Sequence, residues 1–516
     1  MSNDRVLKLA VVGGGSAGWL TAALVAAQHG FGKGVSVTLI ESPDVKTIGV
    51  GEGTWPTMRD TLRKIGISET DFIRQCDASF KQGSKFVNWV NDTPGEFFYQ
   101  PFTTPAGYYE KSIVPYWKPH EQHVSFSNAV CFQEALCEQQ RAPKLITTPE
   151  YEDMANYGYH LNAGKFSELL KHHCTSVLGV SYLSDHVDHV NFNHSDEIES
   201  LTLRNTGCFN ADIFIDCTGF SSLLLGQYME VPFVDKSDVL FIDGALATQV
   251  PYEEDDDPIA SATHSTAQEA GWIWDIGLVH RRGVGHVFSS KYITREKAEL
   301  QLREYLRASI GDKADSIEVR YIPIKSGHRE VFWKNNCVAI GLSAGFLEPL
   351  EASALALVEY AATLLSERLP LFKEAIPIVA QKFNQDMSYH WQRIIDFLKL
   401  HYTLSQRNEP FWVANRDEAT IPETLKEQLL QWKYRFPESD EFTHTREVFP
   451  AAGYQYVLYG MGFKTEVPDY MQSKEGASQA FELMKQNQRI TGEFLSRMPT
   501  NRELLNKIHE YGLQVL

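Results

Sequence analysis

Three glycines near the start of the sequence are spaced for binding a dinucleotide. Gly13, Gly15 and Gly18 form a G-x-G-x-x-G motif that follows an apolar run and precedes a stretch with helical spacing. In this motif the first glycine permits a tight turn, the second lets the backbone approach a pyrophosphate, and the third lets helix and strand pack closely. Glu41 ends the next apolar run, where it can accept hydrogen bonds from a ribose. Such a residue favours FAD or NAD over NADP.

A strand, a helix and a second strand must position these residues. Leu7–Val12 is an apolar run typical of a buried strand, Trp19–His29 has apolar residues at helical spacing, and Val35–Ile40 is a second strand-like run. The order strand, glycine turn, helix, strand is what the dinucleotide motif requires.

Two later segments favour FAD over NAD. Ala211–Phe220 is a buried strand that runs into a Thr-Gly turn, and Asn336–Glu351 combines a strand, a glycine-rich turn and a helix. Flavoproteins of the aromatic-hydroxylase fold use such a pair of segments, whereas two ordinary strand-to-helix turns are the plain alternative. The sequence holds no second complete nucleotide motif, so a flavin bound here must receive its electrons from elsewhere.

The chain of 516 residues divides by pattern into two parts. Short alternating runs and glycine turns predict an α/β FAD-binding body over residues 1–368, and long helical patterns predict a mostly helical region over 369–516. The net charge of −18 argues against nucleic-acid and anionic membrane surfaces, and no 18-residue apolar run predicts a membrane span. Seven cysteines without zinc spacing indicate reduced thiols, no metal site and a cytoplasmic protein.

Several motifs together resemble the flavin-dependent halogenases of the tryptophan-halogenase family. They are VVGGGSAGW, GVGEGTWP (residues 49–56), ASFKQGSKFVNW (78–89), GWIWDI (271–276), RRGVGHVFSS, FLEPLEASA and HYTLSQRNEPFW (401–412), and they occur in the family's order. The resemblance implies that a separate flavin reductase supplies reduced FAD, which reacts with O2 and a halide to give hypohalous acid. This oxidant would pass through an internal tunnel and halogenate an electron-rich aromatic ring in a separate chamber.

The resemblance places the two catalytic roles on Lys81 and Glu351. A buried ammonium can donate strong hydrogen bonds to hypohalous acid or form a haloamine, and a nearby carboxylate can hold the lysine and remove the ring proton. Lys85 and Glu348 are the rival candidates. Without the resemblance, Lys81 reads as a surface lysine and Glu351 as a carboxylate at a helix start.

The other site residues also follow from the resemblance. FAD contacts are expected from Gly13, Gly15, Ser16, Ala17, Gly18, Glu41, Val50, Gly51, Val187, Leu342 and Leu355. The halide is expected at Ser353 and Ala354, where backbone N–H groups at a helix start favour an anion. Here the family's ESTG becomes EASA, so Ala352 replaces a serine and Ala354 a glycine, and the choice between bromide and chloride stays open.

The substrate side is less defined by the sequence. Gln100 and Phe102 resemble part of the family's pocket, with glutamine in place of histidine, and Tyr454 and Tyr456 are pocket candidates that also suit plain core. An indole, an indole derivative or tryptophan fits equally well. Trp272 and Trp274 lie on one face of a strand and are expected to wall the substrate off from the flavin. Gly277 stands where the family has proline, which predicts a looser end to that wall.

Two other functions compete with a halogenase. A flavin-dependent aromatic monooxygenase would share the fold but would bind its substrate beside the flavin, without a remote lysine and glutamate. A non-catalytic FAD-binding relative would have no reason to keep Lys81 and Glu351. The resemblance also carries the expectation of a homodimer.

Overall fold

The chain folds into two compact units, each assembled from three separate segments. The computed structural model describes residues 6–30, 34–44, 51–93, 95–109, 112–442, 444, 446–468 and 472–515. The first unit comprises Met1–Ala78, Leu161–Lys236 and Lys325–Trp391, and the second comprises Ser79–His160, Ser237–Ile324 and Gln392–Leu516. This division differs from the predicted boundary at residue 368, because the chain alternates between the units and a pattern read along the sequence does not show such alternation.

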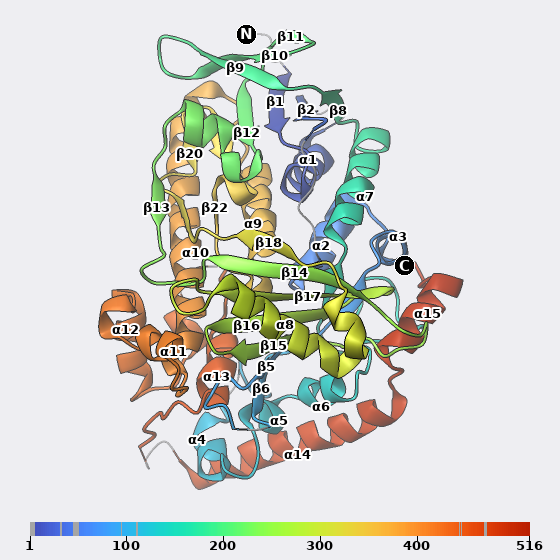
Figure 1. Ribbon diagram of the computed structural model, residues 1–516, viewed down its shortest axis with the longest axis vertical. Helices are drawn as coiled ribbons and strands as arrows, with labels where there is room; N and C mark the ends of the chain where they lie inside the picture. The colour runs from blue at the N-terminus through green and yellow to red at the C-terminus, as the bar shows by residue number, and fades with distance from the viewer. Residues whose placement is uncertain are drawn as a thin grey trace. The chain divides into compact units, whose positions relative to one another are not determined.

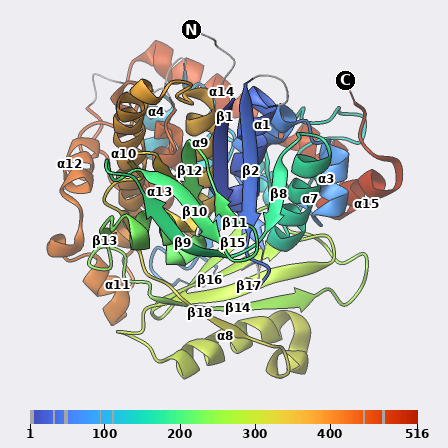
Figure 2. The same cartoon turned by 90° about the horizontal axis from the view of Figure 1, so that it is seen from above.

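The first unit is built on a six-stranded, mostly parallel sheet with the order β20-β21-β12-β1-β2-β8. Every neighbouring pair is parallel except β20 with β21. The strands are β1 (Leu7–Val12), β2 (Val35–Glu41), β8 (Ser181–Ser184), β12 (Ile213–Asp216), β20 (Trp333–Lys334) and β21 (Cys337–Ala339). Figure 2 shows β1, β2 and α1 (Ser16–His29) side by side. The predicted strand, turn, helix and strand are therefore confirmed.

Apolar helices cover this parallel sheet. Helix α1 is buried from Gly18 to Ala26 and packs against α7 (Ala163–Ser176) and α9 (Ser353–Glu367). A parallel sheet with covered faces needs strands that are largely apolar, and β1 (LKLAVV) is apolar and buried at every position except the exposed Lys8. Because β1, β12 and β21 run in the same direction, the turns that follow them lie at one edge of the sheet.

The second unit is built on a seven-stranded mixed sheet with the order β18-β14-β17-β16-β15-β5-β6. Only the pair of β5 and β15 is parallel. The strands are β5 (Gly83–Val87), β6 (Phe97–Pro101), β14 (Gly244–Pro251), β15 (Thr263–Gln268), β16 (Gly271–Gly277), β17 (Arg281–Phe288) and β18 (Arg320–Pro323). Helix α8 (Arg295–Ile310) lies along β14 and β17 (Figure 1), where His286 Nδ1 and the carbonyl oxygen of Ala298 are 2.9 Å apart.

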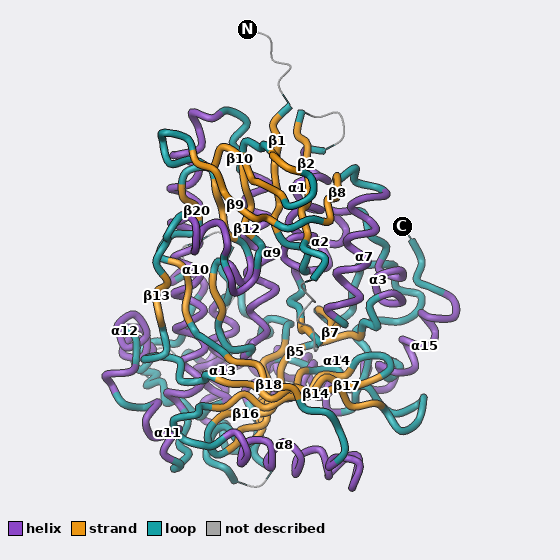
Figure 3. Tube along the Cα trace, turned by 45° about the horizontal axis from the view of Figure 1, so that its top comes forward, coloured by secondary structure: helices purple, strands orange, loops and turns teal. Residues whose placement is uncertain are grey.

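Helices dominate the last part of the chain, as predicted. They are α10 (Ile376–Leu404), α11 (Pro410–Asn415), α12 (Glu423–Trp432), α13 (Ala451–Gly460), α14 (Lys474–Arg497) and α15 (Asn501–Tyr511). Figure 3 shows the helices and strands by colour along the Cα trace. Within the described ranges, no helix combines the length and the apolar character needed to cross a bilayer.

Shorter elements complete both units. In the first they are β3 (Glu52–Gly53), α2 (Thr57–Ile65), α3 (Glu69–Gln75), β9 (Val187–Phe192), β10 (Ile198–Leu203), β11 (Gly207–Phe209), β13 (Phe233–Asp235), β19 (Gly327–Arg329) and β22 (Gly345–Phe346). In the second they are α4 (Val114–Trp117), α5 (Phe126–Val130), α6 (Gln133–Glu138), and β4 (Ser79–Lys81) paired with β7 (Gly158–Leu161).

Candidate active site

The glycine turn after β1 has the geometry that each glycine of the motif requires. Gly13 has a φ of 115°, and a Cβ there would overlap the carbonyl oxygen of Cys217. A Cβ at Gly18 would overlap the carbonyl oxygen of Gly13, so the fold itself demands both glycines. Gly15 differs, because a Cβ there would meet no atom within 4 Å. The start of α1 therefore faces open space, as a helix N-terminus that receives a phosphate group should.

The other two turns at this edge pack against the first. A Cβ at Gly341 would lie 2.7 Å from the Cβ of Ala17, in the first turn of α1. Leu342 follows directly, and the hydroxyl of Ser343 donates to the carbonyl oxygen of Asp216 at the end of β12. The three turns that the sequence singled out are thus side by side, and together they form a cradle of backbone.

Asp216 is a residue of this cradle that sequence reasoning missed. Its buried carboxylate accepts hydrogen bonds from the backbone N–H groups of Thr218, Leu224 and Leu225 at 3.0, 2.9 and 2.8 Å, and from the Thr218 hydroxyl at 2.6 Å. Burial raises the pKa of Asp216, and the four donors oppose that rise. An aspartate between a buried strand and a Thr-Gly turn was the available signal.

Glu41 ends β2 beside the glycine turn. Its Oε2 accepts from Lys171 Nζ at 2.8 Å and from the Tyr182 hydroxyl at 3.0 Å, while Oε1 lies against the backbone of Gly14. The chain that leads into Val187 meets Glu41 as well, since the N–H of Asp185 donates to the Glu41 carbonyl at 3.0 Å.

The remaining first-unit positions have separate surroundings. Ser16 Oγ lies 2.9 Å from Ser167 Oγ of α7. Gly51 is partly exposed, and Leu355 is buried on α9. Val50 lies outside the described residues.

Glu351 lies in a left-handed turn immediately before α9. Glu351 has φ 63° and Ala352 has φ 54°, conformations that residues with a Cβ seldom adopt. The Glu351 residue is 8% exposed, and its carbonyl oxygen accepts a hydrogen bond from Trp55 Nε1 at 2.8 Å. Ser353 and Ala354 open the 15-residue helix α9, whose N-terminal N–H groups attract anions.

Lys81 ends β4 in the second unit and is 1% exposed. It pairs with Gly158 of β7, which leaves room for the lysine side chain, and its Nζ lies 5.3 Å from the centroid of the Phe102 ring. Two pairs along, Ser79 opposes His160, whose Nε2 lies 2.8 Å from Thr263 Oγ1. Burial and the charge of Lys81 hold the pKa of His160 well below its usual value. Sequence reasoning missed His160.

The rival lysine is engaged elsewhere in the same unit. Lys85 Nζ forms an ion pair with Glu138 Oε1 at 2.5 Å, and the Tyr99 hydroxyl donates to the same carboxylate oxygen. Lys81 and Glu351 belong to different units, and their pairing across the site stays a prediction.

The two tryptophans of GWIWDI lie on one face of β16, and both are buried. The ring centroid of Trp272 is 6.2 Å from Trp89 and 6.5 Å from Trp274. The Trp274 ring lies over Gly285 of β17, where any Cβ would overlap it. Gly277 is tightly surrounded, because a Cβ there would lie 2.9 Å from Ile259 and 3.1 Å from the Tyr252 hydroxyl.

The proposed substrate residues do not all face one space. Gln100 lies against α13, where a Cβ at Gly453 would be 3.3 Å from its Nε2, and the Tyr456 hydroxyl donates to the Thr103 carbonyl at 2.9 Å. Tyr454 instead packs on Phe397, Trp432 and Phe442 with centroids 4.8–5.0 Å away. Residues two positions apart in a helix are rotated by about 200° around its axis, so the side chains of Tyr454 and Tyr456 point in opposite directions.

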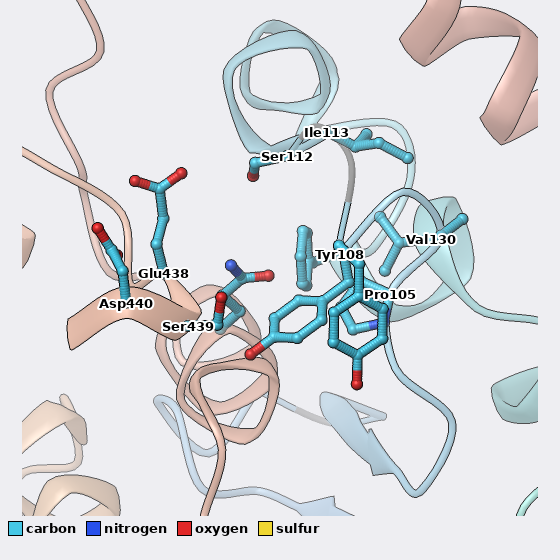
Figure 4. Close-up of a pocket in the computed structure, with 12 residues that line it drawn as sticks. Pro105, Tyr108, Ser112, Ile113, Val130, Glu438, Ser439 and Asp440 are labelled. Atoms are coloured by element: carbon cyan, nitrogen blue, oxygen red, sulfur yellow. The ribbon is translucent and has the colours of Figure 1, made fainter. Parts of the chain in front are cut away.

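A cavity of about 200 Å³ adjoins the segment that follows Phe102. Figure 4 shows the carboxylates of Glu438 and Asp440 on one side of it and the apolar side chains of Ile113 and Val130 on the other. Its lining residues are Pro105, Ala106, Tyr108, Tyr109, Ser112, Ile113, Phe126, Val130, Glu438, Ser439, Asp440 and Gln455. Because Gln455 belongs to α13, one face of that helix borders the cavity.

The architecture is a mixed α/β fold with a parallel sheet and a helical C-terminal region, which is the class that the sequence predicts. The family model described as tryptophan halogenase matches residues 8–476. A tryptophan halogenase from Shewanella frigidimarina NCIMB 400 has a crystal structure that is 48% identical over 99% of both chains, with a TM-score of 0.96.

Two further relatives agree with this assignment. The tryptophan 6-halogenase SttH from Streptomyces toxytricini is 32% identical over 476 residues, which cover 88% of this chain and 89% of SttH. The flavin-dependent halogenase Xcc4156 from Xanthomonas campestris is 27% identical over 99% of this chain and 100% of its own, with a TM-score of 0.86. The chain belongs to the tryptophan halogenase family, whose members are flavin-dependent enzymes.

Proposed function

We propose that this enzyme uses reduced FAD, O2 and bromide or chloride to halogenate an electron-rich aromatic compound, an indole or an indole derivative. The observation that carries the proposal is the burial of Lys81, at the family's active position, with its ammonium against the Phe102 ring. A lysine is almost never fully buried unless it is paired, and two other fully buried lysines, Lys144 and Lys399, donate to oxygens that hold them in place. What distinguishes Lys81 is its place in the segment that resembles the family's active-lysine motif. Lys85, the alternative, is bound to Glu138.

The cradle of the first unit fits FAD in the manner of the aromatic-hydroxylase fold. The open space at Gly15 and the first turn of α1 would receive the pyrophosphate, Glu41 would accept from the ribose, and the turn at Leu342 would border the flavin half. Bound FAD, reduced by a separate flavin reductase, would supply two electrons and the halide two more, so that O2 becomes hypohalous acid and water.

The protein residues would then hold the halide and direct the oxidant. The backbone N–H groups at Ser353 and Ala354 would bind the halide, because alanine keeps the donors that a glycine or serine has there. The Lys81 ammonium would hold hypohalous acid by hydrogen bonds. The lowered pKa of His160 keeps that imidazole neutral, so it would add no second positive charge beside the ammonium. The Glu351 carboxylate would accept the proton that the aromatic ring loses when the halogen adds.

Trp272 and Trp274 would act as a wall that a small oxidant can bypass and an aromatic substrate cannot. The substrate would lie between Lys81, Phe102 and the chain segment that Tyr456 holds through Thr103. The cavity beside that segment gives a larger aromatic compound room to extend.

A panel of substrates tests the proposal. The enzyme, FAD, NADH and a general flavin reductase are incubated in air with bromide or chloride and with indole, tryptophan or a phenol, and products are identified by mass spectrometry. We expect a monohalogenated product that requires halide, and Lys81→Ala should reduce its rate at least about 100-fold, as loss of a group acting on the transferred atom does. Lys85→Ala is the matched control and should keep most of the rate. A hydroxylated product formed without halide would instead establish a monooxygenase.

A further inference from the structure

We propose that Trp55 is a positioning residue for Glu351, which it holds in a backbone conformation that the sequence around Glu351 does not favour. The inference rests on the proposed role of Glu351 as the proton acceptor. Trp55 belongs to the segment GVGEGTWP, one of the motifs that resemble the family. Its indole N–H donates to the Glu351 carbonyl over a distance of 2.8 Å.

The turn that carries Glu351 needs such support. Two consecutive residues with side chains, Glu351 and Ala352, have φ values of 63° and 54°. A Cβ crowds the backbone in this region, so neither residue would adopt it unless the surroundings imposed it. A left-handed conformation at one residue fixes the direction of the next, and the pair therefore sets the aim of the Glu351 side chain relative to α9.

Trp55 is itself held on a rigid element. It precedes Pro56 and α2, and its carbonyl accepts from the N–H of Met58 at 3.1 Å. Helix α2 is tied to α9 a second time, where the Thr61 hydroxyl donates to Glu359 Oε1 at 2.7 Å. Two hydrogen bonds thus connect the same pair of segments, one at Glu351 in the turn and one at Glu359 in α9, eight residues further along the chain. The indole donor is fixed relative to the helix that the turn begins.

The departures from the family pattern are consistent with this role. With alanine at position 352 the serine hydroxyl is gone, and with it a side chain that can bond to nearby backbone in a turn. An indole has a single donor and a flat, inflexible ring, which makes it a suitable substitute restraint from outside the turn.

Kinetics of Trp55→Phe test the proposal, because phenylalanine keeps a ring and removes the N–H. We expect the kcat for halogenation to fall at least 10-fold, with the KM for the aromatic substrate and the affinity for FAD within 2-fold of wild type. Hypohalous acid, measured by its reaction with a small β-diketone, should still form at the wild-type rate. A general structural defect would lower both rates together.

A second substitution supplies the rescue. Glycine adopts a φ of 54° without steric cost, so Ala352→Gly added to Trp55→Phe should restore at least half of the lost kcat. Trp333→Phe is the matched control, since it removes another first-unit indole bond, that of Trp333 Nε1 to the Asn335 carbonyl at 3.0 Å, and should keep the wild-type kcat. If Trp55→Phe does not fold, Ala352→Val replaces it, because a β-branched residue resists this φ, and should show the same loss.

The proposal is overturned if Trp55→Phe keeps the wild-type kcat, if Trp333→Phe loses as much, or if Ala352→Gly restores nothing. A readout independent of activity separates these results from failure of the proposed function. In protein labelled with ¹⁵N-tryptophan, the indole resonance that Trp55→Phe removes should exchange with solvent at least 100-fold more slowly than an exposed indole. Fast exchange would refute the hydrogen bond even in an active halogenase, and slow exchange would support it even if no halogenated product formed.

Discussion

Replacing Gly285 by alanine should displace the Trp274 ring and destabilise the second unit. A Cβ at Gly285 would lie well inside 3.0 Å of Cζ2 and Cη2 of Trp274, and 2.6 Å from the Leu246 carbonyl oxygen. Restoring contact distances of about 3.5 Å requires the ring to move by about 1 Å within a closely packed interior. Trp272 packs against that ring, with centroids 6.5 Å apart, and both rings are buried, so the movement is resisted. Overpacking of this kind costs about 1–3 kcal/mol.

Urea unfolding of matched alanine variants measures this cost. Gly492→Ala is the control: it changes an exposed glycine in α14, in the same unit, where a Cβ would meet no atom within 4 Å. The free energy of unfolding of that variant should rise by about 0.5–1 kcal/mol, because alanine has a higher helix propensity than glycine. Replacement of glycine by alanine should therefore lower the free energy of unfolding at position 285 and raise it at position 492.

A double variant locates the cause. Phenylalanine lacks the outer ring atoms that a Cβ at residue 285 would overlap, so Trp274→Phe should offset part of the damage done by Gly285→Ala. The two changes should couple by at least about 1 kcal/mol. Free energies of unfolding for Gly285→Ala within about 0.3 kcal/mol of wild type, or strictly additive effects in the double variant, would refute the packing of Trp274 on Gly285.

Two further predictions concern the first unit. Gly15→Ala should leave thermal stability unchanged but weaken FAD binding at least about 10-fold in a fluorescence titration, since its Cβ enters space meant for the ligand, whereas Gly18→Ala should lose stability by about 1–3 kcal/mol because its Cβ overlaps Gly13. An equal effect at both glycines would contradict this. Burial raises the pKa of Glu359 to about 7 from 4.5, so the folded state keeps a proton that the unfolded chain releases, and stability from this group is present below about pH 4.5 and lost as the pH rises through 7. Glu359→Gln should therefore exceed wild type by about 1–3 kcal/mol in urea unfolding at pH 8 and by nothing at pH 4; a constant difference would count against it.

Local patterns predicted the dinucleotide-binding elements well. The strands Leu7–Val12 and Val35–Glu41 match the predicted runs within one residue, and α1 begins at Ser16, three residues before the first apolar residue used to predict it. These elements were predictable because the motif constrains consecutive residues. Gly18, which packs against the turn, and Gly15, which leaves open space at the start of α1, lie within the same six residues.

Contacts between distant segments could not be predicted in this way. Trp55 and Glu351 are 296 positions apart, and their hydrogen bond depends on the folding of α2 against α9. The left-handed turn was hidden for another reason: Glu351 and Ala352 are followed by strong helix formers, and neither is a residue that favours positive φ. Asp216 lay in a segment already recognised as a turn, but the four donors that converge on it come from the fold.

The backbone at Glu351 connects the two tasks proposed for this segment. In a regular helix the carbonyl of residue 351 would point along the axis toward later N–H groups, and the helix would start before the glutamate. The left-handed pair turns the chain, so that α9 starts at Ser353 and the Glu351 carbonyl receives the Trp55 indole. The N–H groups of the first turn of α9 are then available for an anion, while the Glu351 carboxylate extends from the turn that precedes the helix. The aim of the carboxylate depends on these two φ angles, whereas the N–H groups stay available for an anion as long as α9 begins at Ser353. The substitutions Ala352 and Ala354 preserve every backbone donor, and the restraint that the sequence has lost at position 352 is one that Trp55 can provide.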